Sequence, residues 1–232
     1  MGLESLQLAN RNVGICINAR VLSSRCPRKL IRAFAGTTLL DIALSKLSKI
    51  NVPEKCIAAG DDEIIDIYEK YSMNIKLLKR LPDAIASGEH PHSVSFRHYN
   101  DMESDFILIM NPCLPFTTAE TYEKAIEYFI SDVKLKSLTS VLTMKDIFFD
   151  DRGTVITLPD INHVSSTTSK VLYKMAHIFH IINKHYFMKE GKVWSYEQND
   201  PAFLNVLGKE CFDIDNEEEF SYCEDLYKKG VR

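Results

Sequence analysis

The residues of this sequence best suited to chemistry begin with a basic loop near the amino end. Five cations and two serines fall between positions 20 and 32: Arg20, Ser23, Ser24, Arg25, Arg28, Lys29 and Arg32. Guanidinium groups bind phosphate oxygens in pairs, an ammonium group adds a point charge, and hydroxyl groups donate hydrogen bonds. The loop therefore predicts a site for a polyphosphate, with a solvated basic loop as the alternative.

Two carboxylates near the other end of the chain form a second candidate group. Asp213 and Asp215 are separated by one residue, and in an extended segment both would lie on one face, roughly 7 Å apart along the backbone. Paired hard oxygen ligands suit Mg²⁺, which completes its shell with water and substrate phosphates. By itself the pair is a weak signal, because a strand-to-helix turn often carries such acids.

Short apolar runs alternate with amphipathic segments along most of the chain. This alternation predicts a mostly parallel sheet with helices on both sides. We expect strands at 13–18, 55–59, 75–78, 105–110, 137–144, 176–182 and 203–207, and helices at 37–50, 61–71, 92–102, 117–131 and 216–229.

Polar residues follow three of the expected strands directly. The basic loop follows the first strand, Asp61 the second and Asn111 the fourth. Ligands of parallel sheets lie beyond the carboxyl ends of the strands, so we expect one shared rim. Asp61 would hold the metal or cap its helix, and Asn111 would bind substrate or only end its strand.

The rhythm breaks between positions 145 and 176. This segment is polar and irregular, and it predicts an arm, lid or dimerisation element inserted into one domain that spans 13–232, after an extension of residues 1–12. Composition agrees with one large domain, since 232 residues with 45% hydrophobic side chains can bury a substantial core.

Composition also excludes several classes of function. A net charge of -4 argues against a general nucleic-acid binder, and no apolar stretch reaches the roughly 18 residues of a membrane span. Six cysteines without a close pair indicate reduced thiols and a cytoplasmic protein. A metal site at His90 and His92 is possible, but a polar loop is the better interpretation.

The spacing of the basic loop resembles that of the cytidylyltransferases which activate sialic acid and 3-deoxy-manno-octulosonate. Their shared start, Ala-Arg-x-x-Ser-x-Arg-x-Pro-x-Lys, matches Ala19, Arg20, Ser23, Arg25, Pro27 and Lys29. Three further blocks match in the same order: 59–64, 107–116 and 212–220. The resemblance spans nearly everything beyond residue 12.

The resemblance implies a Rossmann-like three-layer fold of the nucleotide-diphospho-sugar transferase type, and commonly a homodimer built through an arm. It implies CTP as donor, Mg²⁺ on Asp213 and Asp215, an acidic sugar as acceptor, and a role in surface polysaccharide synthesis. The predicted catalytic residues are Lys29, Arg20 and Asp215. The predicted nucleotide-binding residues are Ala19, Arg20, Ser23, Ser24, Arg25, Lys29 and Arg80, and the predicted acceptor-binding residues are Asn111, Lys170 and Lys174.

The acceptor half departs from the family pattern. The Arg-x-x-x-Leu-Pro and Asn-Gly-Ala blocks that recognise the sugar are missing, and the matching region reads 165–177 instead. Lys170, Lys174 and His177 would then serve another acid, such as a phosphonate, or none. Two alternatives remain: a nucleotidyltransferase with another nucleotide and a sugar phosphate, and a non-catalytic nucleotide-binding relative.

Overall fold

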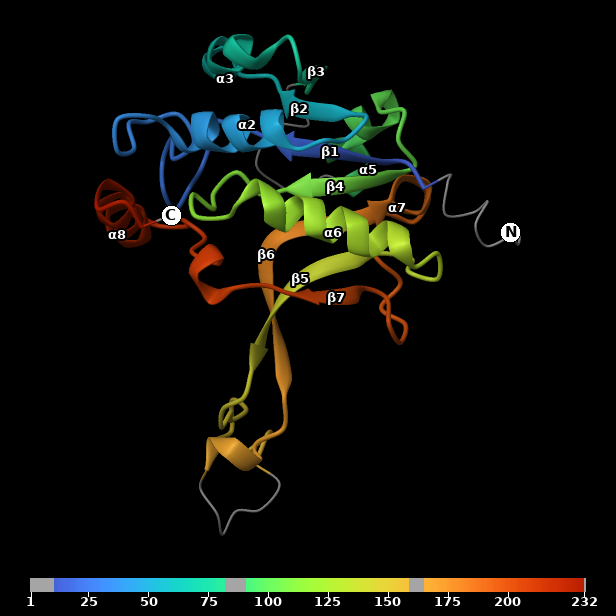
Figure 1. Cartoon of the computed structure of the whole chain (residues 1–232), viewed down its shortest axis with the longest axis vertical. Coiled ribbons are helices and arrows are strands. Elements are labelled where there is room, and N and C mark those ends of the chain that lie inside the picture. Colours follow the sequence, from blue (N-terminus) through green and yellow to red (C-terminus); the bar gives the residue numbers. More distant parts are fainter. Residues whose placement is uncertain (1–10, 82–90, 159–164, 232) are drawn as a thin grey trace.

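A single twisted sheet organises the chain, for which a computed structural model describes residues 11–81, 91–158 and 165–231. Its seven strands lie in the order β3-β2-β1-β4-β6-β5-β7 (Figure 1). Their bounds are β1 Val13–Asn18, β2 Lys55–Ala59, β3 Lys76–Lys79, β4 Phe106–Met110, β5 Leu138–Met144, β6 Leu172–Asn183 and β7 Ala202–Asn205.

The predicted mostly parallel sheet is confirmed. Strands β1 to β4 are parallel to one another, and β7 is parallel to β5. Strand β6 alone runs antiparallel, to both β4 and β5. The sequence located this strand only as 176–182; it begins at Leu172, because its first residues pair with β5 outside the body of the sheet.

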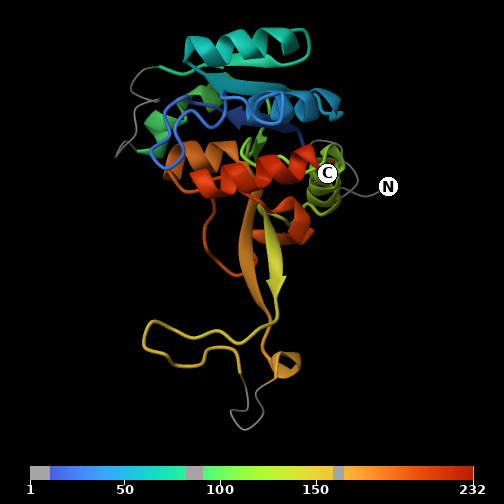
Figure 2. The ribbon, with the colours of Figure 1, turned by 90° about the vertical axis from the view of Figure 1, so that its left-hand side faces the viewer.

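Helices cover both faces of the sheet, as the alternation predicted. Helices α2 (Leu39–Lys49), α3 (Asp62–Tyr68) and α6 (Ala119–Ser131) lie on one face, while α5 (His92–Ser95) and α7 (Lys184–Glu190) lie on the other (Figures 1 and 2). Helix α8 (Glu217–Lys228) crosses the carboxyl rim. Short 3₁₀ turns are η1 (Glu69–Tyr71), η2 (Arg97–Asp101), η3 (Ser166–Thr168) and η4 (Gly208–Glu210).

The two faces carry different hydrophobic cores. Alternate residues of β1 point to opposite faces, so that Ile15 and Ile17 join the core under α2 and α6, whereas Cys16 joins Tyr99 and Phe187 under α5 and α7. The second core is the smaller one. The cavity described below opens on this face, where β1 ends with Asn18.

Two of the expected helices differ most clearly from the structure. The segment 92–102 is not one helix, because Phe96 leaves the helical conformation between α5 and η2. The helix expected from residue 117 begins two residues later: Thr118 is the N-cap of α6, and the Thr117 hydroxyl donates to the Glu210 carbonyl at 3.1 Å.

Strands β5 and β6 continue beyond the body as a two-stranded arm (Figures 1 and 2). The described part of its tip holds η3 and a bridge between Phe149 and Val155. Several large apolar side chains are exposed there, including Phe149 at 59% and Tyr173 at 54%. The structure shows the arm, while its role in dimerisation and the homodimer itself stay predictions.

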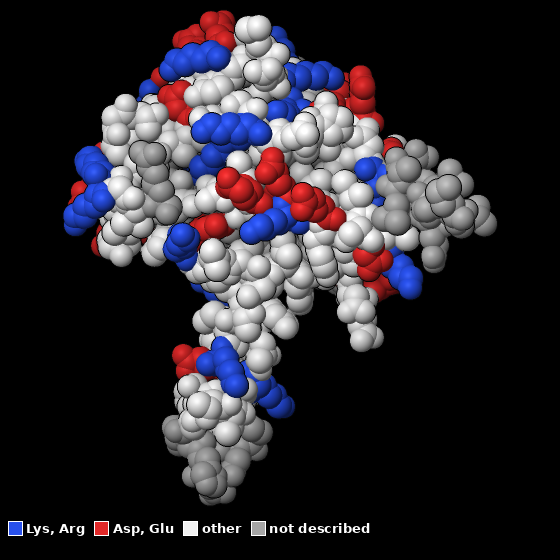
Figure 3. All heavy atoms as spheres, in the orientation of Figure 1, with Lys and Arg blue, Asp and Glu red and all other residues white. Residues whose placement is uncertain are grey.

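The remaining surface features concern the distribution of charged side chains and the state of the cysteines. Cations and carboxylates are interspersed over the described residues on the face shown in Figure 3, so no broad basic surface for nucleic acid is visible there. No helix in the described ranges is long and apolar enough to span a membrane. All six cysteines are free, and five of them are buried.

Candidate active site

The loops after β1, β2 and β4 open on one rim, as expected from their parallel pairing. The backbone N–H of Ala19 donates to the Ala58 carbonyl at 2.9 Å, which fastens the start of the basic loop to β2. The Asp61 carboxylate accepts from the Val21 N–H at 3.0 Å. Asp61 is the N-cap residue of α3 but makes no side-chain bond to that helix. Its contact with Val21 is a role that the sequence did not predict, and the alternative role in holding the metal stays a prediction.

The five cations of the basic loop divide into two groups. Arg28 forms a two-pronged pair with Glu63, and Arg32 does the same with Glu217, so these two cations fasten the loop to α3 and α8. The three remaining cations, Arg20, Arg25 and Lys29, line a cavity of about 280 Å³. The two serines, Ser23 and Ser24, line the same cavity, which we call the loop cavity.

The basic loop and the carboxylate pair meet at Asp215. Its Oδ1 atom lies 3.1 Å from Lys29 Nζ and 2.9 Å from Arg25 Nη2. Lys29 also donates to the carbonyl of Ile214 and is only 14% exposed. Burial alone would lower the pKa of Lys29, but Cys113 and Asp215 outweigh burial and raise it. Lys29 is therefore a fixed positive charge facing the acid pair.

Asp213 carries an oxygen atom that lacks a protein partner. Its Oδ1 is buried and has no hydrogen bond within the described chain, while Oδ2 accepts from Asn111 Nδ2 at 3.0 Å. Burial and the neighbouring Asp215 raise the pKa of Asp213. A buried, unpaired carboxylate oxygen beside a second carboxylate is the environment that a bound cation would relieve.

These residues fit the predicted magnesium site. Two carboxylates supply hard oxygen ligands, and no third His, Cys, Asp or Glu in the described ranges gathers with them. Magnesium typically takes one or two carboxylates and completes its shell with water and substrate phosphates. The assignment of Mg²⁺ to Asp213 and Asp215 remains a prediction.

Asn111 is committed to contacts within the chain. Its amide nitrogen donates to Asp213 Oδ2 and to the His177 carbonyl, both at 3.0 Å, and its oxygen accepts from the Cys113 N–H at 2.9 Å. Both N–H groups are thus used. For the predicted contact with an acceptor, Asn111 has only one lone pair of its side-chain oxygen left. The geometry therefore favours a role in holding Asp213.

We expect Asn111→Ala to weaken magnesium binding about 10- to 100-fold, the usual cost of losing a group that orients a metal ligand. Titration of Mg²⁺ by calorimetry with CTP present would measure this. Asn216→Ala is the control, because it removes an asparagine side chain that only caps α8. Unchanged magnesium affinity in the Asn111 variant would contradict the assigned role.

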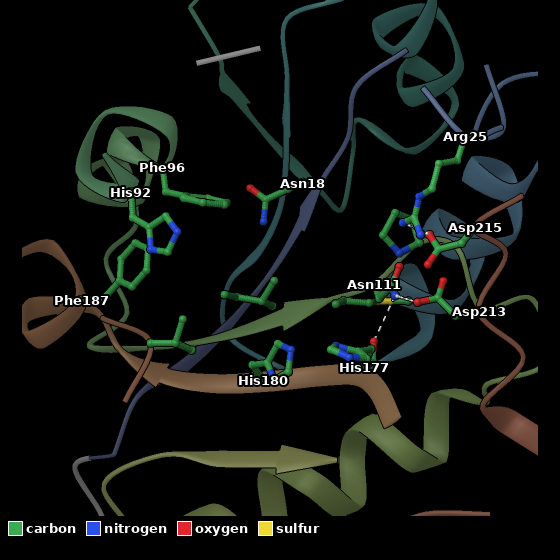
Figure 4. A pocket seen from close by; sticks show the side chains of 14 residues that line it. Asn18, Arg25, His92, Phe96, Asn111, His177, His180, Phe187, Asp213 and Asp215 are labelled. Atoms are coloured by element: carbon green, nitrogen blue, oxygen red, sulfur yellow. Dashed lines mark hydrogen bonds and ion pairs between the residues drawn. The ribbon is translucent and has the colours of Figure 1, made fainter. Parts of the chain in front are cut away.

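A larger cavity of about 650 Å³ adjoins the basic loop and extends over β4 and β6 (Figure 4). The acid pair and Arg25 lie at one end, and the rings of His92, Phe96 and Phe187 lie at the other. His177 and His180 of β6 form its floor. Sequence reasoning assigned no role to Asn18, Phe96, His180 or Phe187, since their positions lie in different elements and form no motif.

A buried pair of side chains holds Asn18 at the end of β1. Its Oδ1 atom lies 2.8 Å from His98 Nε2, and its Nδ2 donates to the Tyr99 hydroxyl at 2.8 Å. His98 is 2% exposed and Tyr99 is fully buried. Burial and the nearby Arg80 lower the pKa of His98 to about 3, so this imidazole is neutral near pH 7.

The depressed pKa of His98 predicts acid sensitivity. Between pH 6.5 and about 3 the unfolded chain binds a proton at this imidazole and the folded chain does not, so stability falls as pH falls. The expected slope is about 1.4 kcal/mol per pH unit from this group. Urea unfolding from pH 7 to 5 should show a shallower loss for His98→Gln than for the wild type. His185→Gln, at an exposed position, is the control. Equal slopes in the wild type and His98→Gln would show that the acid sensitivity does not come from His98.

Three other predicted site residues lie outside the loop cavity. Arg80 follows β3, is 7% exposed, and donates to the Ala19 carbonyl at 3.4 Å from beneath the loop. Lys174 lines a hollow of about 320 Å³ with Asp213 and Asp215. Lys170 lies on the arm and lines none of these three cavities. The structure thus places Lys174 beside the acid pair, whereas Lys170 shares no cavity with Asp213 and Asp215.

Comparison with known proteins identifies a family for most of the chain. The family model for cytidylyltransferases matches residues 15–231, which include the basic loop and the acid pair. No curated protein matches the sequence.

Solved structures share the fold at low identity. A CMP:2-keto-3-deoxy-manno-octonic acid synthetase complexed with CTP has 12% identity and a TM-score of 0.67, over 94% of this chain and 99% of that one. A 4-diphosphocytidyl-2C-methyl-D-erythritol synthase from Anaerococcus prevotii has 16% identity and a TM-score of 0.66, over 96% and 99%. A cytidylyltransferase from Leptospira borgpetersenii has 14% identity and a TM-score of 0.62, over 95% and 88%.

Proposed function

Because this chain belongs to the cytidylyltransferase family, we propose that it transfers CMP from CTP to a hydroxyl group of an acidic sugar and releases pyrophosphate. The observation that carries the proposal is the meeting of Lys29 and Arg25 with Asp215 across one cleft. A triphosphate needs cations, and its metal needs carboxylates. Both sets come together here from opposite ends of the sequence.

The chain's own residues would act by position and charge. Arg20, Arg25 and Lys29 would bind the triphosphate oxygens, and the hydroxyl groups of Ser23 and Ser24 would donate hydrogen bonds to them. Asp213 and Asp215 would hold Mg²⁺, which when bound offsets negative charge on the departing pyrophosphate. Lys29 is fixed by two contacts, so it requires little reorganisation during the reaction.

The acceptor would enter the larger cavity. That cavity reaches from the acid pair toward His92, Phe96 and Phe187, and it adjoins the loop cavity along Asn18, Arg25, Asn111 and Asp215. An acceptor hydroxyl in the larger cavity would face the α-phosphate of a nucleotide held by the basic loop. Positioning of this kind supplies much of the rate in an in-line displacement.

A second candidate is the same transfer to another acceptor, such as a phosphonate. Two observations favour keeping it. The sugar-recognition blocks of the acidic-sugar enzymes are missing from the sequence, and the fold resembles a methylerythritol enzyme as closely as an octonic acid enzyme.

The test is pyrophosphate release with Mg²⁺ across the four nucleoside triphosphates and a panel of acceptors. The panel holds 3-deoxy-manno-octulosonate, 2-keto-3-deoxy-nononate, N-acetylneuraminate and 2-aminoethylphosphonate. We expect turnover with CTP and one of the sugar acids. Turnover with the phosphonate alone would establish the second candidate, and preference for another nucleotide would overturn the proposed donor.

A further inference from the structure

Asn18 lies where the two cavities join. It is the last residue of β1, and it lines both the loop cavity with Lys29 and the larger cavity with His180 (Figure 4). A side chain at this junction can contact a group that approaches from the larger cavity toward the phosphates. Ser23 and Ser24 line the loop cavity but not the larger one, and both N–H groups of Asn111 are already used within the chain.

The amide of Asn18 is fixed with one N–H group left over. His98 is neutral, and its Nδ1 is buried without a hydrogen bond in the described chain. A buried N–H without a partner is rarer than a buried lone pair, so the proton belongs on Nε2 and is donated to Asn18 Oδ1. Asn18 Nδ2 then faces Tyr99 with one N–H, and its second N–H has no partner within the described residues.

The far end of the larger cavity is built from rings. His92 stacks on Phe187 with centroids 5.8 Å apart, and Phe96 meets Phe187 edge to face at 5.7 Å. We call these three residues the ring wall. Phe96 also stacks on Tyr99 at 5.4 Å, so the ring wall and the pair that orients Asn18 form one rigid cluster.

The charge of lysine and arginine side chains is confined to the other end of this cavity. Arg25 is the only Lys or Arg among the described residues that line it, and Arg25 is paired with Asp215 at 2.9 Å. His180, on the floor, has its pKa lowered to about 4 by burial and by His177. An anionic group at the ring wall would therefore meet no Lys or Arg among the described residues that line this cavity.

From these observations we infer that Asn18 and the ring wall determine which acceptor is used. Asn18 donates its second N–H to an oxygen of the acceptor, and the ring wall contacts an uncharged, partly apolar group at the acceptor's opposite end. The inference rests on the proposed cytidylyl transfer, and it names the acceptor as an acid whose remote end carries such a group.

The experiment compares Asn18→Ala with the wild type in two separate measurements. Calorimetry with CTP and Mg²⁺ gives the nucleotide Kd, and pyrophosphate release with the best sugar acid of the panel gives the acceptor KM and kcat. We expect the acceptor KM to rise about tenfold or more, the usual cost of a lost buried hydrogen bond, while the nucleotide Kd changes less than twofold.

Two further variants make the result specific. Tyr99→Phe keeps Asn18 but removes one of the groups that orient it, so it should raise the acceptor KM by a smaller factor. Asn12 lies next to the opposite end of β1 and lines neither cavity. The acceptor KM of Asn12→Ala should therefore match that of the wild type. If Asn18→Ala fails to fold, Asn18→Ser replaces it with the same expectation.

The ring wall is tested with a matched pair of acids. N-acetylneuraminate and 2-keto-3-deoxy-nononate differ by an N-acetyl group in place of a hydroxyl. We expect kcat/KM to favour the acetylated acid about tenfold in the wild type and less in Phe96→Leu. Preference for the hydroxylated acid overturns the ring-wall assignment.

The outcomes separate this inference from the proposed function. Wild-type turnover with an acid, together with an unchanged acceptor KM in Asn18→Ala, overturns the inference and leaves the function standing. A higher nucleotide Kd with an unchanged acceptor KM assigns Asn18 to the nucleotide and overturns the inference too. Binding of CTP without turnover of any acid overturns the acidic-sugar proposal, and the inference falls with it.

Discussion

Replacing Asp215 with asparagine is expected to lower kcat for pyrophosphate release by on the order of a thousandfold. The substitution keeps the size of the side chain but removes the negative charge that faces Lys29 and Arg25. It also removes one of the two proposed ligands for magnesium. Steady-state pyrophosphate release at saturating CTP would measure the loss.

The same variant should separate metal binding from nucleotide binding. Without the charge on Asp215, the two cations are released toward the triphosphate, so CTP should bind without Mg²⁺ at least as tightly as in the wild type. The added affinity that Mg²⁺ gives should disappear. Glu218→Gln, exposed on α8, is the control and should behave as wild type. Turnover of Asp215→Asn within tenfold of wild type would refute the role of Asp215.

Lys29→Met is the second large effect, with kcat expected to fall about 100- to 1000-fold. Methionine keeps most of the buried stem but removes the ammonium group that contacts Asp215 and the Ile214 carbonyl. The charge on phosphate oxygens in the transition state then loses a fixed donor. Single-turnover kinetics with CTP bound would show whether the loss lies in the chemical step.

The basic loop supplies a matched control for Lys29. Arg28 is the residue before it, and its guanidinium pairs with Glu63 at an exposed position. Exposed pairs of this kind contribute little to stability, and Arg28 does not line the loop cavity. Arg28→Gln should therefore retain kcat within about twofold. An equal loss in both variants would indicate a general effect of loop charge instead.

The proposed phosphate side of the site could be located from the sequence because its residues are local. Arg20, Ser23, Arg25 and Lys29 lie in one loop, and a strand before it with a helix after it places that loop on the carboxyl rim. The carboxylate pair was readable for the same reason. The contact between the two depends on the whole fold, and only the resemblance made it predictable.

The proposed acceptor side could not be located from the sequence in the same way. Asn18, Phe96, His180 and Phe187 come from β1, the segment after α5, β6 and α7, and only packing brings them together. The division of the five cations was also hidden, since Arg28 and Arg32 differ from Arg25 and Lys29 only in their neighbours on α3 and α8. The antiparallel direction of β6 could not be predicted, because an apolar run has the same pattern whichever way the strand runs in the sheet.

The central claim is that a nucleotide's phosphates and a divalent ion lie between the basic loop and the acid pair. Its most direct test is a crystal of the protein grown with CTP and Mn²⁺, with anomalous diffraction measured to locate the metal. The account predicts an anomalous peak at coordination distance, roughly 2.1 Å, from oxygens of Asp213 and Asp215, with phosphate density reaching Arg25 and Lys29. Manganese and phosphates bound away from these four side chains would contradict it.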